Sequence, residues 1–318
     1  MEKTHYFRMA ACLLVLALTG SASAYNQPLG LNLGFTSFMD GAPPAGPGFY
    51  FQEYVGFLTF DDFSDAPPFL AGAEDIDAWV SLNQFIYQSN TPVLFGGKWG
   101  LNVIVPVICI DANPADVLPD NATGVGDLTV GPYLQWDPIM GEQGPIFMHR
   151  IEFQMIFPSG SYHQDEILNP SSNAFSFNPY WAGTYFITPK WTVSGRFHYL
   201  WNGENDDPFV GIEALGFDEV QAGEALHANF ATSYEVLPHQ LRVGLNGYWL
   251  DQISATEGQT QAGSTIDLED DEQVFAIGPG ALLSFSQDTH LFFNVYFETE
   301  TDSRPEGEKF VLRFVHHF

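Results

Sequence analysis

Polar and apolar residues alternate with a period of two along most of the chain after residue 48. About twelve segments show this pattern, and each is close to the roughly ten residues that a tilted membrane-spanning strand needs. The expected strands cover residues 49–60, 77–87, 98–108, 126–136, 146–157, 174–187, 190–201, 220–236, 239–251, 273–285, 290–299 and 309–318. No segment of similar length shows the 3.6-residue period of an amphipathic helix. The sequence therefore predicts an all-β protein.

The expected strands each have one apolar and one polar face. In one of them Leu241, Val243 and Leu245 alternate with Arg242 and Asn246. A soluble β-sandwich also buries one face, but here tryptophans stand near both ends of the strands, as in the aromatic belts of membrane proteins. The belt candidates are Trp79, Trp99, Trp136, Trp191, Trp201 and Trp249. The apolar faces are therefore expected to contact lipid.

The links between the expected strands alternate between long and short. The long links are residues 61–76, 109–125, 158–173, 202–219, 252–272 and, as the shortest of them, 300–308. They contain most of the clustered acidic residues, whereas the intervening links are mostly tight turns. Outer-membrane barrels have long loops outside and short turns on the periplasmic side. Residues 48–318 are therefore predicted to form a transmembrane antiparallel up-and-down β-barrel of about 12 strands.

The first 47 residues divide into two parts. Residues 1–24 have the features of a secretory signal peptide: Lys3 and Arg8, a short apolar run, and a small-residue cleavage site that ends near Ala24. Residues 25–47 are rich in Gly and Pro and carry scattered apolar side chains. Two arrangements remain open for this segment: a lead-in on the periplasmic side, or a plug that folds into the barrel.

The C-terminus indicates how the barrel closes. The last ten residues alternate up to a terminal aromatic residue, so Phe314 and Phe318 lie on the same face of the last strand. A barrel has no free edge only if its last strand pairs with its first. The pattern also resembles the signal that the barrel-assembly machinery recognises. The sequence therefore predicts an outer-membrane location in a Gram-negative-type cell.

Composition narrows the set of partners. The formal net charge is −29, which repels nucleic acid and anionic headgroups, so no nucleic-acid partner is expected. The expected partners are outer-membrane lipid, lipopolysaccharide, the assembly machinery and a small-molecule permeant. No cofactor and no metal site is predicted, because carboxylate runs are usually solvated and His316 and His317 point to opposite faces.

A few ionisable residues fall on the faces expected to line the lumen. A charge at the lipid midplane costs about 2–4 kcal/mol, so these side chains should point inward. The lumen or selectivity candidates are Asp127, Arg150, Glu152, Arg196, His198, Arg242, Glu298 and Arg313. They could brace the lumen through salt bridges, or they could orient a polar or anionic group of a permeant. Asp127 could pair with a lumenal arginine.

Three sequence blocks resemble an outer-membrane family labelled "protein involved in meta-pathway of phenol degradation". They are GAPPAGPGFYFQ at residues 41–52, TGVGDL at 123–128 followed by GPY at 131–133, and FPSGSY at 157–162. The blocks occur in the family's order across most of the chain. The resemblance implies a channel for small, often aromatic, hydrophobic molecules.

The predicted function is passive uptake of small hydrophobic or aromatic solutes through an outer-membrane channel, and no enzymatic activity is expected. Two alternatives remain: a structural or adhesion barrel that displays acidic loops, and a barrel enzyme that modifies membrane lipids. An enzyme would need an ordered nucleophile and base. The best pair in the sequence is Ser194 with His198, four residues apart on one strand.

Overall fold

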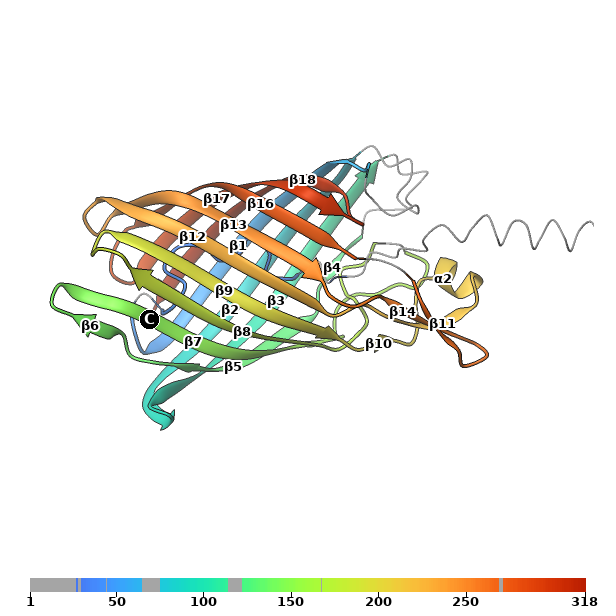
Figure 1. Cartoon of the computed structure of the whole chain (residues 1–318), viewed down its shortest axis with the longest axis horizontal. Coiled ribbons are helices and arrows are strands. Elements are labelled where there is room, and N and C mark those ends of the chain that lie inside the picture. Colours follow the sequence, from blue (N-terminus) through green and yellow to red (C-terminus); the bar gives the residue numbers. More distant parts are fainter. Residues whose placement is uncertain are drawn as a thin grey trace, which may run out of the picture.

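The computed structural model describes residues 27, 30–43, 45–64, 75–113, 122–166, 168–268 and 271–318. Within these residues, twelve antiparallel strands form a closed barrel (Figure 1), which confirms the predicted fold class. The strands are β1 (Gly48–Asp62), β2 (Asp75–Leu94), β3 (Gly97–Asn113), β5 (Leu128–Gln135), β7 (Gly144–Phe157), β8 (Ser176–Phe186), β9 (Trp191–Asn202), β12 (Ala225–Leu237), β13 (Leu241–Gln252), β16 (Gln273–Ser284), β17 (Thr289–Asp302) and β18 (Glu306–His317). The expected signal peptide lies outside the described residues.

The barrel closes between its first and last strands. β1 pairs with β18 from Tyr50 opposite His317 to Asp62 opposite Glu306. The backbone N–H of Phe318 donates to the carbonyl oxygen of Phe49 at 3.0 Å, so pairing reaches the last residue. The alternation of the C-terminal segment thus serves closure, because an incomplete β18 would leave an open edge in the bilayer.

The two faces of the strands are separated as their alternation predicts. On β13, Leu245 is 52% exposed on the outer surface, whereas Asn246 and Tyr248 are fully buried in the lumen. β18 shows the same alternation, with Leu312 outside and Arg313 inside. Outward apolar residues suit lipid, and inward polar residues need partners inside the barrel.

The two ends of the barrel differ in their connections. At one end, called here the short-turn end, β2 and β3 are joined by Phe95 and Gly96, whose positive φ angles of 51° and 77° suit a tight hairpin. The opposite, long-loop end carries the longer links. The link between β17 and β18 is an exception there, because both strands extend further than expected and leave only residues 303–305 between them.

Short elements cover the long-loop end. β10 (Glu204–Asn205), β11 (Phe217–Gln221), β14 (Glu257–Thr260) and β15 (Thr265–Asp267) form a second sheet beside the helix α2 (Val210–Ala214), at the right of Figure 1. β12 begins at Ala225 rather than at the expected Val220, because Val220 pairs with Gly258 in this sheet.

Two further short strands extend the barrel wall. β4 (Thr123–Val125) pairs with β3, and β6 (Ile139–Gly141) pairs with β7. In the described part of the chain, no helix has the length and apolar character needed to cross a bilayer.

Candidate functional site

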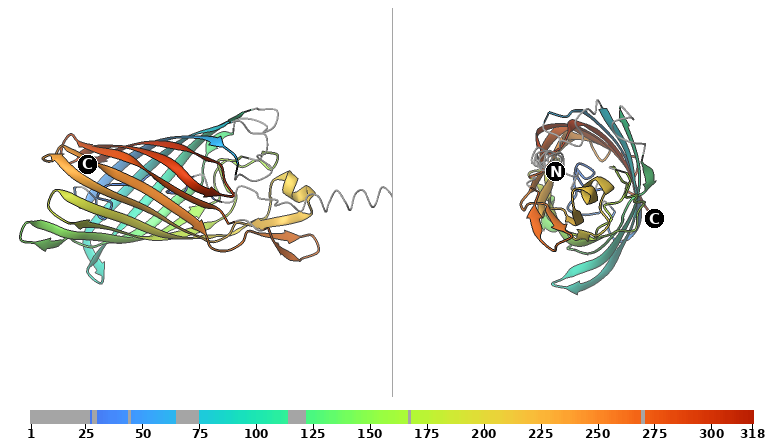
Figure 2. Two further views of the ribbon diagram at one scale, coloured as in Figure 1. Left: turned by 45° about the horizontal axis from the view of Figure 1, so that its top comes forward. Right: turned by 90° about the vertical axis from the view of Figure 1, so that its right-hand side faces the viewer.

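Residues 30–43, called here the inner segment, lie inside the barrel. Leu31, Phe35 and Phe38 are each at most 3% exposed. Seen along the barrel axis, the blue trace of this segment lies within the ring of strands (right view of Figure 2). Gln27 contacts Gly223 at the long-loop end, so the chain runs from there through the lumen to β1 at the short-turn end.

Side chains of the wall hold the backbone of the inner segment halfway along the lumen. Asn229 on β12 accepts a hydrogen bond from the N–H of Gly34 at 2.6 Å and donates to the carbonyl oxygen of Asn32 at 2.7 Å. Lys309 on β18 donates to the carbonyl oxygen of Leu33 at 2.7 Å. Gly34 has a φ of 79°, and a Cβ there would lie 2.9 Å from the rings of Tyr248 and Tyr296. This close approach requires glycine.

The strongest contact of the inner segment is a buried ion pair. The guanidinium group of Arg196 donates to both carboxylate oxygens of Asp40, at 2.6 and 2.8 Å. Arg150 lies 3.7 Å from the same carboxylate, and the Arg196 guanidinium is 4.1 Å from the centre of the Tyr180 ring. The sequence analysis missed Asp40, although it is the one acidic residue within this Gly- and Pro-rich stretch.

Glu152 lies next to this ion pair, but its hydrogen-bond partners are the uncharged side chains of Asn102, Gln154 and Tyr180. It accepts hydrogen bonds from Asn102 at 2.8 Å, from Gln154 at 2.9 Å and from the hydroxyl of Tyr180 at 2.5 Å. Tyr180 therefore contacts both Glu152 and Arg196. The structure thus brings together three of the candidates, Arg150, Glu152 and Arg196, close to Asp40, which was not predicted.

Glu298 lies in a separate cluster nearer the long-loop end. It accepts hydrogen bonds from the Tyr248 hydroxyl at 2.6 Å and from Arg304 at 3.0 Å. Arg304 also pairs with Glu272 at 3.0 Å. Arg304 follows β17, in the link that was expected to be a long loop, so the pattern gave no reason to place it inside.

His198 stacks on His227, with ring centres 4.0 Å apart. Both rings direct a nitrogen to the side-chain oxygen of Asn178, at 3.0 and 3.1 Å. The hydroxyl of Ser194 instead contacts Thr184 and the N–H of Met39. The candidate pair of Ser194 with His198 is therefore not assembled as a nucleophile and base in this structure.

Asp127 is buried at the long-loop end and organises a loop. Its carboxylate accepts hydrogen bonds from the backbone N–H groups of Ser159, Gly160 and Ser172 and from the hydroxyls of Ser171 and Ser172, at 2.6–3.1 Å. No arginine pairs with it among the described residues, which corrects the expected lumenal pairing. In the same loop Tyr162 donates to the carbonyl oxygen of Asp207, and burial raises the pKa of Tyr162.

Replacing Asp127 with Ala should loosen this loop without opening the barrel. Hydrogen bonds to a charged group contribute about 1.5–3 kcal/mol each, so losing the set should raise local opening. Cleavage after Glu166 by a glutamate-specific protease should become about tenfold faster or more. Fragment masses after timed digestion of proteoliposomes would measure this, with Asp137→Asn as a matched surface control. An unchanged cleavage rate would show that the loop does not depend on Asp127.

The tryptophans of the expected belts lie at both ends of the barrel's outer surface. Trp79 is 54% exposed, and Trp99, Trp191 and Trp249 also project outward. Trp136 and Trp201 are half-buried; Trp136 stacks on His149 with ring centres 4.6 Å apart.

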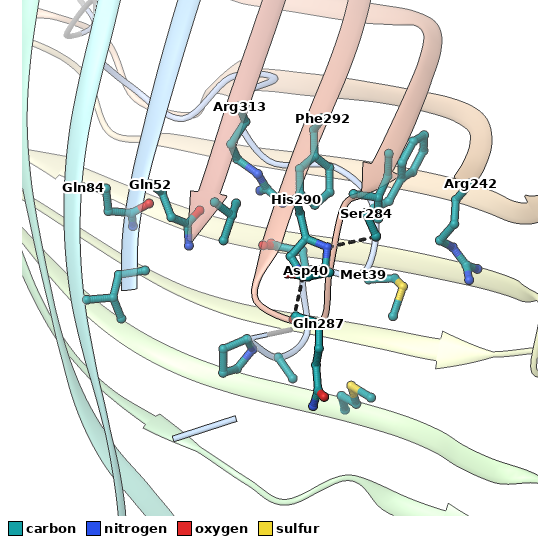
Figure 3. Close-up of a pocket in the computed structure, with 18 of the residues that line it drawn as sticks. Met39, Asp40, Gln52, Gln84, Arg242, Ser284, Gln287, His290, Phe292 and Arg313 are labelled. Atoms are coloured by element: carbon teal, nitrogen blue, oxygen red, sulfur yellow. Dashed lines mark hydrogen bonds between the residues drawn. The ribbon is translucent and has the colours of Figure 1, made fainter. Parts of the chain in front are cut away.

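A cavity of about 470 Å³ lies between the inner segment and the wall at the short-turn end (Figure 3). The inner segment contributes Phe38, Met39 and Asp40 to its lining. The wall contributes Gln52, Tyr54, Gln84, Ile86, Tyr133, Arg150, Arg242, Leu282, His290, Phe292, Arg313 and Val315, among others. Three of the candidates, Arg150, Arg242 and Arg313, therefore line this cavity together.

A family model described as "Putative MetA-pathway of phenol degradation" matches residues 60–314, which is most of the chain. The chain belongs to this family. The resemblance inferred from the three sequence blocks is thus confirmed. No curated protein sequence matches the chain.

Two solved outer-membrane channels are similar in fold to this member of the phenol-degradation family. The COG4313 outer membrane channel from Pseudomonas putida F1 is 17% identical, with a TM-score of 0.73 over 89% of this chain and 100% of that chain. A deltaS2 mutant of the TodX monoaromatic hydrocarbon channel is 9% identical, with a TM-score of 0.50 over 94% and 99%. The barrel and the family place the protein in the outer membrane, as predicted.

Proposed function

We propose that this protein is a passive outer-membrane channel for small hydrophobic or aromatic solutes, in which the inner segment is a displaceable plug. The observation that carries the proposal is the attachment of this segment. Hydrogen bonds and the Asp40–Arg196 ion pair hold it inside the lumen, where Leu31, Leu33 and Phe35 also pack in an apolar cluster with side chains of the wall. Displacement of residues 30–43 would leave a passage lined by both polar and apolar side chains.

The barrel wall does not depend on the plug for its strand pairing. Each strand of the wall pairs with two neighbouring strands, so its ladder is complete without residues 30–43. The wall contacts the plug through side chains such as Asn229 and Thr184, whose hydrogen bonds water can replace. This separation supports movement of the plug within an intact barrel.

The chemistry of the cavity supports the class of solute. Phe38, Tyr54, Ile86 and Phe292 present apolar and aromatic surface at the short-turn end, which outer-membrane barrels direct to the periplasm. Ligand sites are typically apolar cavities of about 300–1,000 Å³ with a few polar groups. The family description, which names phenol degradation, agrees with aromatic solutes.

Locking the plug to the wall tests the function. The N–H of Met39 lies 3.0 Å from the hydroxyl of Ser194, so Met39→Cys with Ser194→Cys, in a Cys109→Ser background, can be joined by a short thiol cross-linker. Proteoliposomes should take up phenol and benzyl alcohol, cross-linking should lower uptake about tenfold or more, and cleavage of the linker should restore it.

Ser194→Cys alone, treated with the same reagent, controls for chemical modification of the lumen. Equal uptake by locked and unlocked protein would contradict the plug, and no uptake by a folded, unlocked barrel would contradict the channel. The roles of Phe314 and Phe318 in barrel assembly and of lipopolysaccharide as a partner stay predictions.

A further inference from the structure

Arg313 is a buried cation without an anionic partner. The residue is only 7% exposed on the inner face of β18, and its guanidinium lies 3.6 Å from the centre of the Phe292 ring and 5.7 Å from that of Tyr54. Its Nε has no hydrogen-bond partner, and none of the described carboxylates pairs with it. A guanidinium has five donors, and stacking on aromatic rings satisfies none of them.

The other arginines of the lumen each have an ion pair or hydrogen-bond acceptors among the described residues, and Arg313 has neither. Arg196 has Asp40, and Arg304 has Glu272 and Glu298. Arg150, whose Nε also lacks a hydrogen-bond partner, lies 3.7 Å from the Asp40 carboxylate. Arg242 donates to the hydroxyls of Ser233 and Thr192, at 3.1 Å each, and to the carbonyl oxygen of Lys190. A buried charge normally requires pairing, so the exception at Arg313 indicates a group that binds there.

The cavity beside Arg313 has an excess of positive charge, in a chain whose net charge is −29. Arg150, Arg242 and Arg313 line it, against Asp40 and Glu235. Asp40 is already paired with Arg196, and Glu235 lies at the rim, where it accepts a hydrogen bond from the N–H of His239. No acid of the lining therefore neutralises Arg313.

Part of the lining beside Arg313 is apolar, although polar side chains such as Gln52, Gln84 and His290 also contribute. Ile86, Leu282, Phe292 and Val315 line the same cavity, whose volume of about 470 Å³ exceeds what a lone inorganic anion fills. Figure 3 shows Phe292 next to the Arg313 side chain, with Gln52 and Gln84 on the other side of Arg313. One strong cation beside an apolar wall matches a molecule with one charged end and one apolar end.

We propose that this cavity binds small aromatic carboxylates, with the carboxylate on the Arg313 guanidinium and the ring against Phe292 and its apolar neighbours. A carboxylate can accept two parallel hydrogen bonds from a guanidinium, which would satisfy the donors that are free in this structure. The inference deepens the proposed function, since it rests on that function for the idea that the bound acid is a permeant.

Equilibrium binding to the folded mature protein in nanodiscs tests the site. Titration calorimetry would compare benzoate with benzyl alcohol, which has the ring without the charge, and with inorganic phosphate, which has the charge without the ring. Benzoate should bind most tightly. Arg313→Gln should weaken benzoate binding about tenfold or more and leave benzyl alcohol unchanged, and Arg313→Lys should fall between them because lysine lacks the planar fork.

Lys190→Gln is the matched control, since it removes one positive charge at the same end of the barrel from an exposed side chain. It should bind benzoate as the native protein does. Benzoate binding that Arg313→Gln leaves unchanged, or phosphate binding as tight as that of benzoate, would overturn the proposal. Heat-modifiable migration on gels would establish that each variant is a folded barrel.

Flux measurements separate this proposal from the channel function. Arg313-dependent benzoate binding without solute flux would support the site and contradict the channel. Flux in which Arg313→Gln leaves the preference for benzoate over benzyl alcohol unchanged, together with Arg313-independent binding, would support the channel and overturn the site.

Discussion

A variant that lacks residues 30–43 is expected to pass small solutes more than about tenfold faster than the native barrel. These residues fill the lumen from the level of Asn229 to the level of Thr184. The strand ladder from β1 to β18 continues without them, so the deletion should leave an open barrel rather than an unfolded chain. Liposome swelling with solutes of increasing size, together with single-channel conductance, would measure the change.

A matched control deletes four residues elsewhere, residues 261–264 of the exposed turn between β14 and β15. This change removes chain from the long-loop end and no contact of the inner segment. It should leave flux near the native value. If the deletion of 30–43 gave native flux in a folded barrel, the long-loop end would have to be the barrier instead.

The barrel itself could be read from the sequence because lipid constrains every strand in the same way. Leu245 and Asn246 on β13 show why: an outward residue must be apolar, whereas an inward one can be polar, and the period of two follows from this difference. The turn between β2 and β3 was predicted less well. The strands were expected to leave residues 88–97 between them, whereas β2 continues to Leu94 and only Phe95-Gly96 form the turn.

The interior of the barrel could be predicted only in part. Alternation put Arg196 and Arg313 on the inner face, but it could not identify Asp40 as the partner of Arg196. Asp40 is 156 positions from Arg196, in a stretch without any period. The inner segment is held through its backbone, as by Asn229 on Gly34, so its own side chains carry little signal for the choice between plug and lead-in.

Asp127 illustrates a different limit. The GDL block was recognisable as a motif, and Asp127 could be predicted to lie on an inward face. The partners are serines and backbone N–H groups of a loop more than thirty residues away, which no strand pattern describes. A buried acid in a basic-lined barrel suggested an arginine, whereas five hydrogen bonds from a loop satisfy it equally well.

Replacing Asp40 with Asn should release the inner segment and raise solute flux about tenfold or more. The substitution leaves Arg196 and Arg150 close together and buried without the carboxylate that pairs with them, and breaking a buried pair in this way costs about 3–5 kcal/mol. Departure of the inner segment would let water reach both guanidinium groups, so the strain favours the open state rather than unfolding of the wall. Proteoliposome uptake and the temperature of heat-modified migration would measure the two effects separately.

Two further variants distinguish loss of the ion pair from loss of a side chain. Asp137→Asn removes an acid whose pairing with Lys98 is exposed, so uptake should remain native. The double variant Asp40→Asn with Arg196→Gln places two neutral amides where the pair was and leaves one fewer unpaired cation, so its uptake should fall back toward the native value. Native uptake by Asp40→Asn alone would show that the hydrogen bonds at Gly34, Leu33 and Gly41 hold the plug without the ion pair, and the barrier would then lie in those backbone contacts.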